Sequence, residues 1–99
     1  MKCFEVTELY VSKLDSEVSY DHAQLKVDEE NTSKWYIEIR NPKEIDFLED
    51  AASTAEELQI MFSVVGRKEM RGVTRVIFVQ IEDYYCHVTL GGISQMIKK

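Results

Sequence analysis

Cys86 and His87 are the adjacent residues whose chemistry would be most useful to an enzyme, since they bring together a nucleophile and a base. Nucleophilic catalysis needs the two groups within hydrogen-bond reach, and usually a third group that orients the base. Successive side chains of a regular strand point to opposite faces, so this pair cannot meet on one. Cys86 and the other cysteine, Cys3, also lack the glycine-rich elbow or helix start that activates catalytic thiols. We therefore predict that the protein is not an enzyme; a small enzyme that uses His87 is kept as an alternative.

A metal site would need several histidine, cysteine or carboxylate side chains to converge, and no spacing in the chain indicates this. The acidic run at 28–31 lacks the alternation and the central glycine of a calcium loop. Gly91 and Gly92 form the single glycine pair, without the flanking pattern of a phosphate-binding loop. The sequence therefore predicts neither a metal nor a cofactor.

Carboxylates are the most abundant charged groups: 18 acids against 12 lysines and arginines give this 99-residue chain a net charge of −6. Many of them fall in two segments, a predicted turn and one face of a predicted helix, and such segments can steer a basic partner electrostatically. We therefore predict a small, acidic, non-enzymatic protein-interaction module of the inhibitor, immunity-protein or accessory-subunit type. The residues expected to bind the partner protein are Asp28, Glu29, Glu30, Glu44, Asp46, Glu49 and Asp50.

Basic residues gather in the C-terminal half, where residues 59–81 carry four bases and one acid. A hairpin that presents Arg67, Lys68 and Arg71, with Arg75 further along the strand, is an alternative site that would bind the backbone of a nucleic acid. The negative net charge opposes general affinity for nucleic acids or anionic membranes, because both depend on neutralising phosphates. Nucleic-acid binding is therefore the second hypothesis, behind the interaction module.

The length and composition fit one domain that spans residues 1–99. Hydrophobic residues make up 44% and charged residues 30%, ordinary values for a soluble globular domain. No run approaches the ~20 apolar residues of a membrane-spanning helix, and Glu5 interrupts the stretch where a signal peptide is apolar. We expect a cytoplasmic protein whose two cysteines are reduced thiols, buried as small hydrophobic side chains.

Strand-like alternation of apolar and polar residues dominates the chain from Leu58 to Leu90. It predicts an antiparallel meander of three strands, with a turn at 67–72 between the first two. Gly91 and Gly92 should end the third strand, and residues 93–97 are spaced for a short helical turn. The residues expected to share a face are Leu58, Ile60, Phe62 and Val64 in the first strand, and Val73, Ile77, Val79 and Ile81 in the second.

Three earlier strands are predicted over residues 3–11, 18–27 and 35–40, with a polar turn at 28–33. A change of phase around Glu8 indicates a bulge in the first strand, and the second needs an irregularity near its middle. The residues that share a face are Phe4, Val6, Leu9 and Val11 in the first strand, Ala23, Leu25 and Val27 in the second, and Trp35, Ile37 and Ile39 in the third.

A helix signal follows these strands, because Asn41 is a preferred N-cap, Pro42 suits the first helical position and Glu44 completes a capping-box arrangement. The helix should end near residues 53–54, and an extension to Glu57 is the alternative. Its apolar stripe consists of Ile45, Leu48 and Ala52, with Phe47 and Ala51 beside them.

Together these elements predict an α+β fold. It is a mostly antiparallel sheet of about six strands in the order β-β-β-α-β-β-β, with one main helix packed on one face and a short C-terminal helical turn. An open sheet of this kind has two exposed edges. Pairing of edge strands between two copies would cover them, so a homodimer through the sheet edge is a further expectation.

Overall fold

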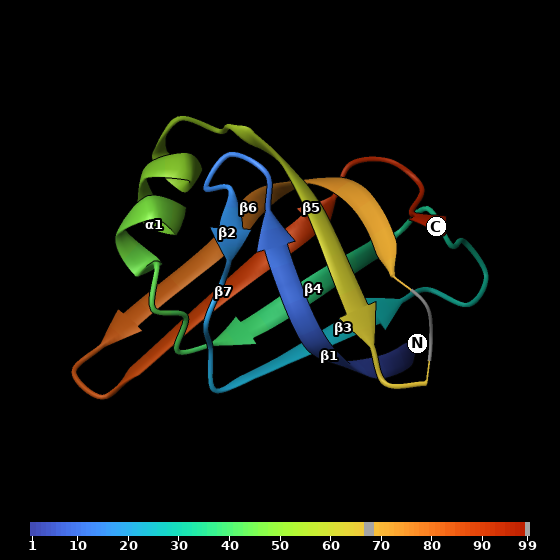
Figure 1. Ribbon diagram of the computed structural model, residues 1–99, viewed down its shortest axis with the longest axis horizontal. Coiled ribbons are helices and arrows are strands. Elements are labelled where there is room, and N and C mark those ends of the chain that lie inside the picture. Colours follow the sequence, from blue (N-terminus) through green and yellow to red (C-terminus); the bar gives the residue numbers. More distant parts are fainter. Residues whose placement is uncertain (67–68, 99) are drawn as a thin grey trace.

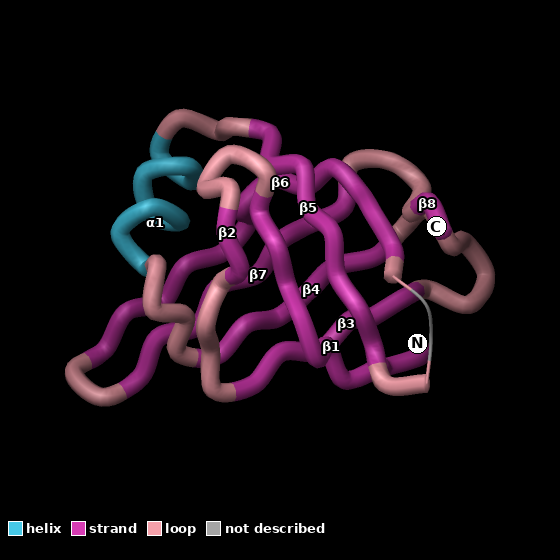
Figure 2. Tube along the Cα trace, in the orientation of Figure 1, coloured by secondary structure: helices cyan, strands magenta, loops and turns pink. Residues whose placement is uncertain are grey.

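The sheet closes on itself. The computed structural model describes residues 1–66 and 69–98, and over these residues six antiparallel strands form a barrel in the order β1-β3-β4-β7-β6-β5, with β5 pairing back to β1 (Figure 1). Figure 2 shows the single short helix of the described chain beside this body of strands. The mostly antiparallel sheet is therefore confirmed, and the prediction that it is open is wrong.

The elements follow the predicted order, with two additional strands of two residues each. Their bounds are β1 Lys2–Val11, β2 Ser16–Glu17, β3 His22–Val27, β4 Trp35–Arg40, α1 Ile45–Ser53, β5 Glu57–Val64, β6 Met70–Glu82, β7 Tyr85–Gly92 and β8 Ile97–Lys98. The predicted strand at 18–27 is thus shorter than expected, and the predicted helical turn at 93–97 is wrong, because Ile97 and Lys98 pair with β6 instead.

Closure depends on β1, which pairs with β3 at its start and with β5 along the rest, while Tyr10 and Val11 also pair with the short β2. Its first residues, Lys2 to Glu5, pair with β3, and the rest, from Val6 to Val11, pair with β5. The register shifts between Val6 and Glu8, which confirms the bulge predicted there. A bulge bends a strand and increases its twist, so one strand can leave its first neighbour and reach the second. The two free edges on which the homodimer expectation was based are therefore paired with each other.

The barrel interior is filled by the alternate residues of each strand. The faces predicted for β3, β4 and β5 are confirmed as inward faces, and in β1 the inward positions change phase at the bulge, from Phe4 and Val6 to Leu9 and Val11. The buried hydrophobic residues are Val6, Leu9, Val11, Val18, Ala23, Leu25, Val27, Trp35, Ile37, Ile39, Leu48, Ala51, Leu58, Ile60, Phe62, Val64, Met70, Val88 and Leu90.

The face predicted for β6 is wrong. Met70, Gly72 and Thr74 point inward, whereas Ile77 and Ile81 are exposed. Two of the inward positions carry residues that an apolar pattern cannot reveal: a glycine, and a threonine whose Oγ1 donates a hydrogen bond to the carbonyl of Leu58 (3.1 Å). A second register shift, between Val76 and Phe78, then changes the phase of the rest of the strand.

Trp35 explains Gly72 of β6 and Gly92 of β7. A Cβ on Gly72 would lie 2.5 Å from Trp35 Cζ2, and one on Gly92 would lie 2.6 Å from Trp35 Cδ2, both closer than real Cβ contacts. The indole Nε1 donates to the carbonyl of Ser94 (2.6 Å), and its ring stacks on Phe62 with centroids 5.8 Å apart. Gly92 is the last residue of β7, which confirms that the glycine pair ends this strand, and its missing side chain makes room for a large core side chain.

The helix is small and begins later than predicted. Asn41 does not cap it: the residue has a φ of 51°, and its side chain accepts a hydrogen bond from the Cys86 amide (2.7 Å) and donates one to Asp21 (2.8 Å). Glu44 occupies the N-cap position without a side-chain capping bond. The end at Ser53 is confirmed, and the extension to Glu57 is wrong, since Glu57 opens β5.

α1 covers one end of the barrel, where Leu48 and Ala51 are buried and the helix packs against β6, rather than one face of a sheet (Figure 1). In the described ranges, no helix has the length and hydropathy to cross a membrane.

Candidate functional site

The hairpin between β6 and β7 extends beyond the barrel. β5 pairs with β6 only as far as Arg75, and β4 pairs with β7 only from His87 onward. The intervening residues 77–86, called the arm below, project beside α1 (Figures 1 and 2). β6 has 13 residues and is longer than its neighbour β5. Its residues after Arg75 therefore have no neighbouring strand except β7 among the described strands.

The arm exposes four large hydrophobic side chains. Ile77 is 63% exposed, Phe78 48%, Ile81 51% and Tyr84 97%. Single exposed hydrophobic residues are normal on a soluble protein, but four within one hairpin form a group of the kind that marks interaction sites. The sequence predicted two of them, Ile77 and Ile81, as core residues. Ile77 lies at the register shift between Val76 and Phe78, whereas Ile81 lies beyond the part of the hairpin that β5 and β4 flank.

Three of the predicted partner-binding acids lie next to the arm. Asp46, Glu49 and Asp50 are exposed on α1, which packs against β6, and none of the three has an ion-pair partner among the described residues. The tip of the arm adds two exposed carboxylates, Glu82 and Asp83. The arm and the outer face of α1 thus present apolar and acidic groups together.

Glu44, the fourth predicted helix acid, differs from the other three. It is half-buried at the start of α1, and its Oε2 is covered without a hydrogen-bond partner in the described part of the chain. The sequence pattern treated it as a capping residue with a solvent-facing charge. The structure places it at the N-cap position, but its side chain makes no capping bond and one of its carboxylate oxygens is buried.

The other predicted acidic segment lies far from the helix. Asp28, Glu29 and Glu30 belong to the β3–β4 connection, at the opposite end of the molecule from α1 (Figure 1). The Asp28 carboxylate is part of the turn itself, because it accepts hydrogen bonds from the amides of Glu30 (2.9 Å) and Asn31 (3.4 Å). The two segments that the sequence grouped by charge therefore form separate surfaces.

The basic cluster is described only in part. Arg67 and Lys68 lie outside the described residues. Arg71 is exposed on β6, and Arg75 pairs with Glu57 of the neighbouring strand, with 3.0 Å between Nη2 and Oε2. One of the two described bases is thus already partnered on the barrel wall.

The chemistry-bearing pair Cys86–His87 is split, as the alternation of a strand requires. Cys86 pairs with Ile81 and is half-buried, while the His87 ring contacts Phe78 and Tyr85 at centroid distances of 5.6 and 6.2 Å. Cys3 is exposed, so its prediction as a buried residue is wrong. No group of three metal-ligating side chains occurs within residues 1–66 and 69–98.

Strand pairing brings together two histidines that the sequence keeps apart. His22 of β3 and His87 of β7 are both paired with Arg40 of β4, so the three residues form one row across the outside of the barrel. With Glu38 and Tyr85 they line a shallow hollow of about 50 Å³. The Arg40 guanidinium lies 5.7 Å from the centre of the Tyr85 ring. No spacing in the sequence could have predicted this row, because it depends on which strands are neighbours.

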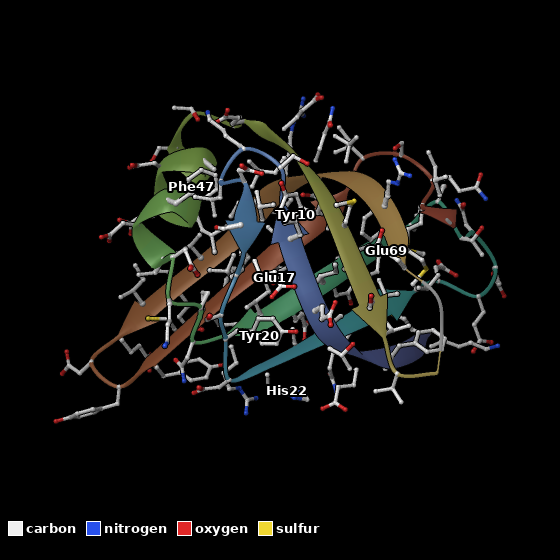
Figure 3. The ribbon with its side chains drawn as sticks, in the orientation of Figure 1. Tyr10, Glu17, Tyr20, His22, Phe47 and Glu69 are labelled. Atoms are coloured by element: carbon white, nitrogen blue, oxygen red, sulfur yellow. The ribbon has the colours of Figure 1, made fainter. Side chains whose placement is uncertain are left out.

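A third acidic group, also missed by the sequence, surrounds Tyr20. Its hydroxyl donates to the carbonyl of Val6 (2.7 Å), and burial raises its pKa, helped by the nearby carboxylates of Glu5, Glu17 and Glu8. Figure 3 shows Glu17 and Tyr20 on the same side of the molecule.

A separate ion pair joins Lys26 and Glu38 on the outside of the barrel, where the hydrogen bond from Lys26 to Glu38 raises the pKa of the lysine.

No protein-family model, curated protein or solved structure matches this chain. Its functional interpretation therefore rests on the chemistry of its own residues.

Proposed function

We propose that the protein is a non-enzymatic interaction module that binds a basic partner protein through the arm and the adjoining acidic face of α1. The observation that carries the proposal is the exposure of Ile77, Phe78, Ile81 and Tyr84 on one projecting hairpin. Protein interfaces are typically centred on aromatic and aliphatic anchors that become desolvated on binding, with polar groups at their rim.

The charge beside the arm indicates the chemistry of the partner. An acidic rim borders the arm; it consists of Asp46, Glu49 and Asp50 on α1 and of Glu82 and Asp83 at the arm tip. None of these five carboxylates forms an ion pair with a described basic residue. A basic partner would be steered toward this rim, and the apolar anchors would then supply most of the affinity. Asp28, Glu29 and Glu30 are outside this surface, because one docking face does not extend to the opposite end of a molecule 35 Å long.

The test begins with capture of a partner on the immobilised protein. The purified partner is then titrated against two variants and a matched control. Ile81→Ser/Tyr84→Ser removes two apolar anchors, and Asp46→Asn/Glu49→Gln/Asp50→Asn removes the helix charges. All five side chains are exposed, so the fold is retained. Loss of a buried anchor typically weakens binding by roughly 2 kcal/mol, a factor of about 30 in Kd.

The matched control is Glu29→Gln/Glu30→Gln, which removes acidic charge from the other end of the barrel. We expect the two variants at the arm and helix to weaken binding, the helix variant to do so most at low salt, and the control to bind like the wild type. Full affinity in both the arm variant and the helix variant would refute the proposal.

A further inference from the structure

The end of the barrel opposite α1 is open and contains a pocket of about 540 Å³. Ligand pockets in proteins typically occupy about 300–1,000 Å³ and are often found in the mouths of β-barrels. The pocket is lined by residues of β1, β3, β6, the β3–β4 connection and the segment before β8. These residues are Lys2, Phe4, Leu25, Val27, Glu29, Thr32, Met70, Gln95 and Met96.

The pocket follows from the way β1 is paired. Its first residues belong to the β3 side of the barrel, and its pairing with β5 begins only at Val6. Inward side chains at this end therefore face one another across the mouth without a strand between them. Phe4, Leu25 and Val27 form one wall, and Met70 with Met96 forms the other. At the opposite end Leu48 and Ala51 of α1 fill the corresponding space.

The polar residues of the pocket lie at its rim, and most of them can donate a hydrogen bond. Lys2 precedes Phe4 and Val6 at two-residue spacing, so its side chain belongs to the inward face of β1. Its aliphatic stem can cover the apolar wall while its ammonium stays at the mouth. Among the described residues this ammonium has no ion-pair partner. Thr32 and Gln95 add a hydroxyl and an amide, and Glu29 is the one carboxylate.

We infer that the barrel mouth binds a small apolar carboxylate, a molecule with a hydrocarbon or aromatic body and one anionic head. The body occupies the space between Phe4, Val27 and Met70, and the carboxylate accepts hydrogen bonds from Lys2 at the rim. Hydrogen bonds between ionised partners are the strong ones, and the apolar walls supply the remaining affinity through the area removed from water. The carboxylate of Glu29 repels the ligand carboxylate, so the affinity is lower than it would be for the same pocket without Glu29.

Isothermal titration of the full chain with decanoate, below its micelle concentration, tests the inference. Decylamine and decanol have the same body with a positive and a neutral head. We expect decanoate to bind at least tenfold more tightly than either, because it alone can pair with Lys2. Amide chemical-shift changes should be confined to residues of the mouth, and Met96→Trp, which places a bulky ring in the pocket from a half-exposed loop position, should abolish binding.

Two charge variants at exposed rim positions make the test specific. Lys2→Met keeps the length and the apolar stem and should weaken decanoate binding about tenfold, while Glu29→Gln should strengthen it. For decylamine the Glu29→Gln change should act in the opposite direction. The inference is overturned if decanoate does not bind, if decylamine binds more tightly, or if Lys2→Met binds decanoate as well as the wild type does.

Discussion

Gly92→Ala should be among the most destabilising single-methyl additions in this protein. The new Cβ would lie 2.6 Å from Trp35 Cδ2, and the ring cannot swing away easily. It is 2% exposed, stacked on Phe62 and held by the bond from its Nε1 to the carbonyl of Ser94. Either the indole or the β7 backbone must therefore move.

The magnitude follows from what that movement disrupts. Overpacking a well-filled core typically costs about 1–3 kcal/mol. Displacing the indole also breaks its hydrogen bond to Ser94, and loss of such a bond contributes about 1 kcal/mol more. We therefore expect Gly92→Ala to lower the free energy of unfolding by about 2–4 kcal/mol. For a chain of this size that corresponds to a decrease in Tm of roughly 10–25 °C.

Urea denaturation followed by the fluorescence of Trp35, the single tryptophan, measures the change directly. Gly91→Ala is the matched control: it adds the same methyl group to the neighbouring residue of the same strand. There the Cβ would lie 3.0 Å from the Cδ1 and Cγ2 atoms of Ile77, an exposed side chain that can rotate, so the cost should stay below about 1 kcal/mol. Equal stability of the two variants would refute the proposed role of Trp35.

Three other substitutions test separate features of the fold. Asn41→Ala should lower the free energy of unfolding by about 2–3 kcal/mol in chemical denaturation, because it removes the hydrogen bonds to Cys86 and Asp21 and places an alanine at a φ of 51°. A cost below about 0.5 kcal/mol, the size of an ordinary surface change, would contradict this. Arg75→Ala should cost less than about 1 kcal/mol, since both it and Glu57 are about half exposed, and a larger loss would show that the pair is more than a surface ion pair. Burial raises the pKa of Tyr20 above its ordinary value, so folding is favoured by its protonated form, and the resulting stabilisation is fully present at neutral pH and is lost as the pH rises through the folded-state pKa. Tyr20→Phe should therefore flatten the alkaline decrease in the free energy of unfolding above about pH 10, and an unchanged slope would be inconsistent with this origin.

Local pattern accounts for most of the strands. Alternation predicted β4 from Trp35 to Arg40, and the change of phase at Glu8 predicted a real bulge. These features depend on side chains a few residues apart, whose faces follow directly from the two-residue period of a strand. The same pattern is misleading on β6. Gly72 occupies an inward position there because a side chain would clash with the ring of Trp35, 37 residues earlier in the chain.

The helix cap shows how a tertiary contact overrides a local signal. Asn41, Pro42 and Glu44 form a strong capping sequence, yet the Asn41 side chain bonds to Cys86 and Asp21, and α1 begins at Ile45. A capping bond and a bond to another strand compete for the same amide group, and only the assembled barrel brings the second partner within reach.

By itself, the sequence determined the order of the main strands along the chain, the helix between β4 and β5, and the acidic character of the surface. The tertiary structure decided that β1 pairs with both β3 and β5, so that the sheet closes, one acidic segment lies at each end, and the arm and the open mouth exist at all. The physical reason is that periodicity specifies which face of a strand is apolar, whereas the choice of neighbouring strand depends on packing between residues far apart in the chain.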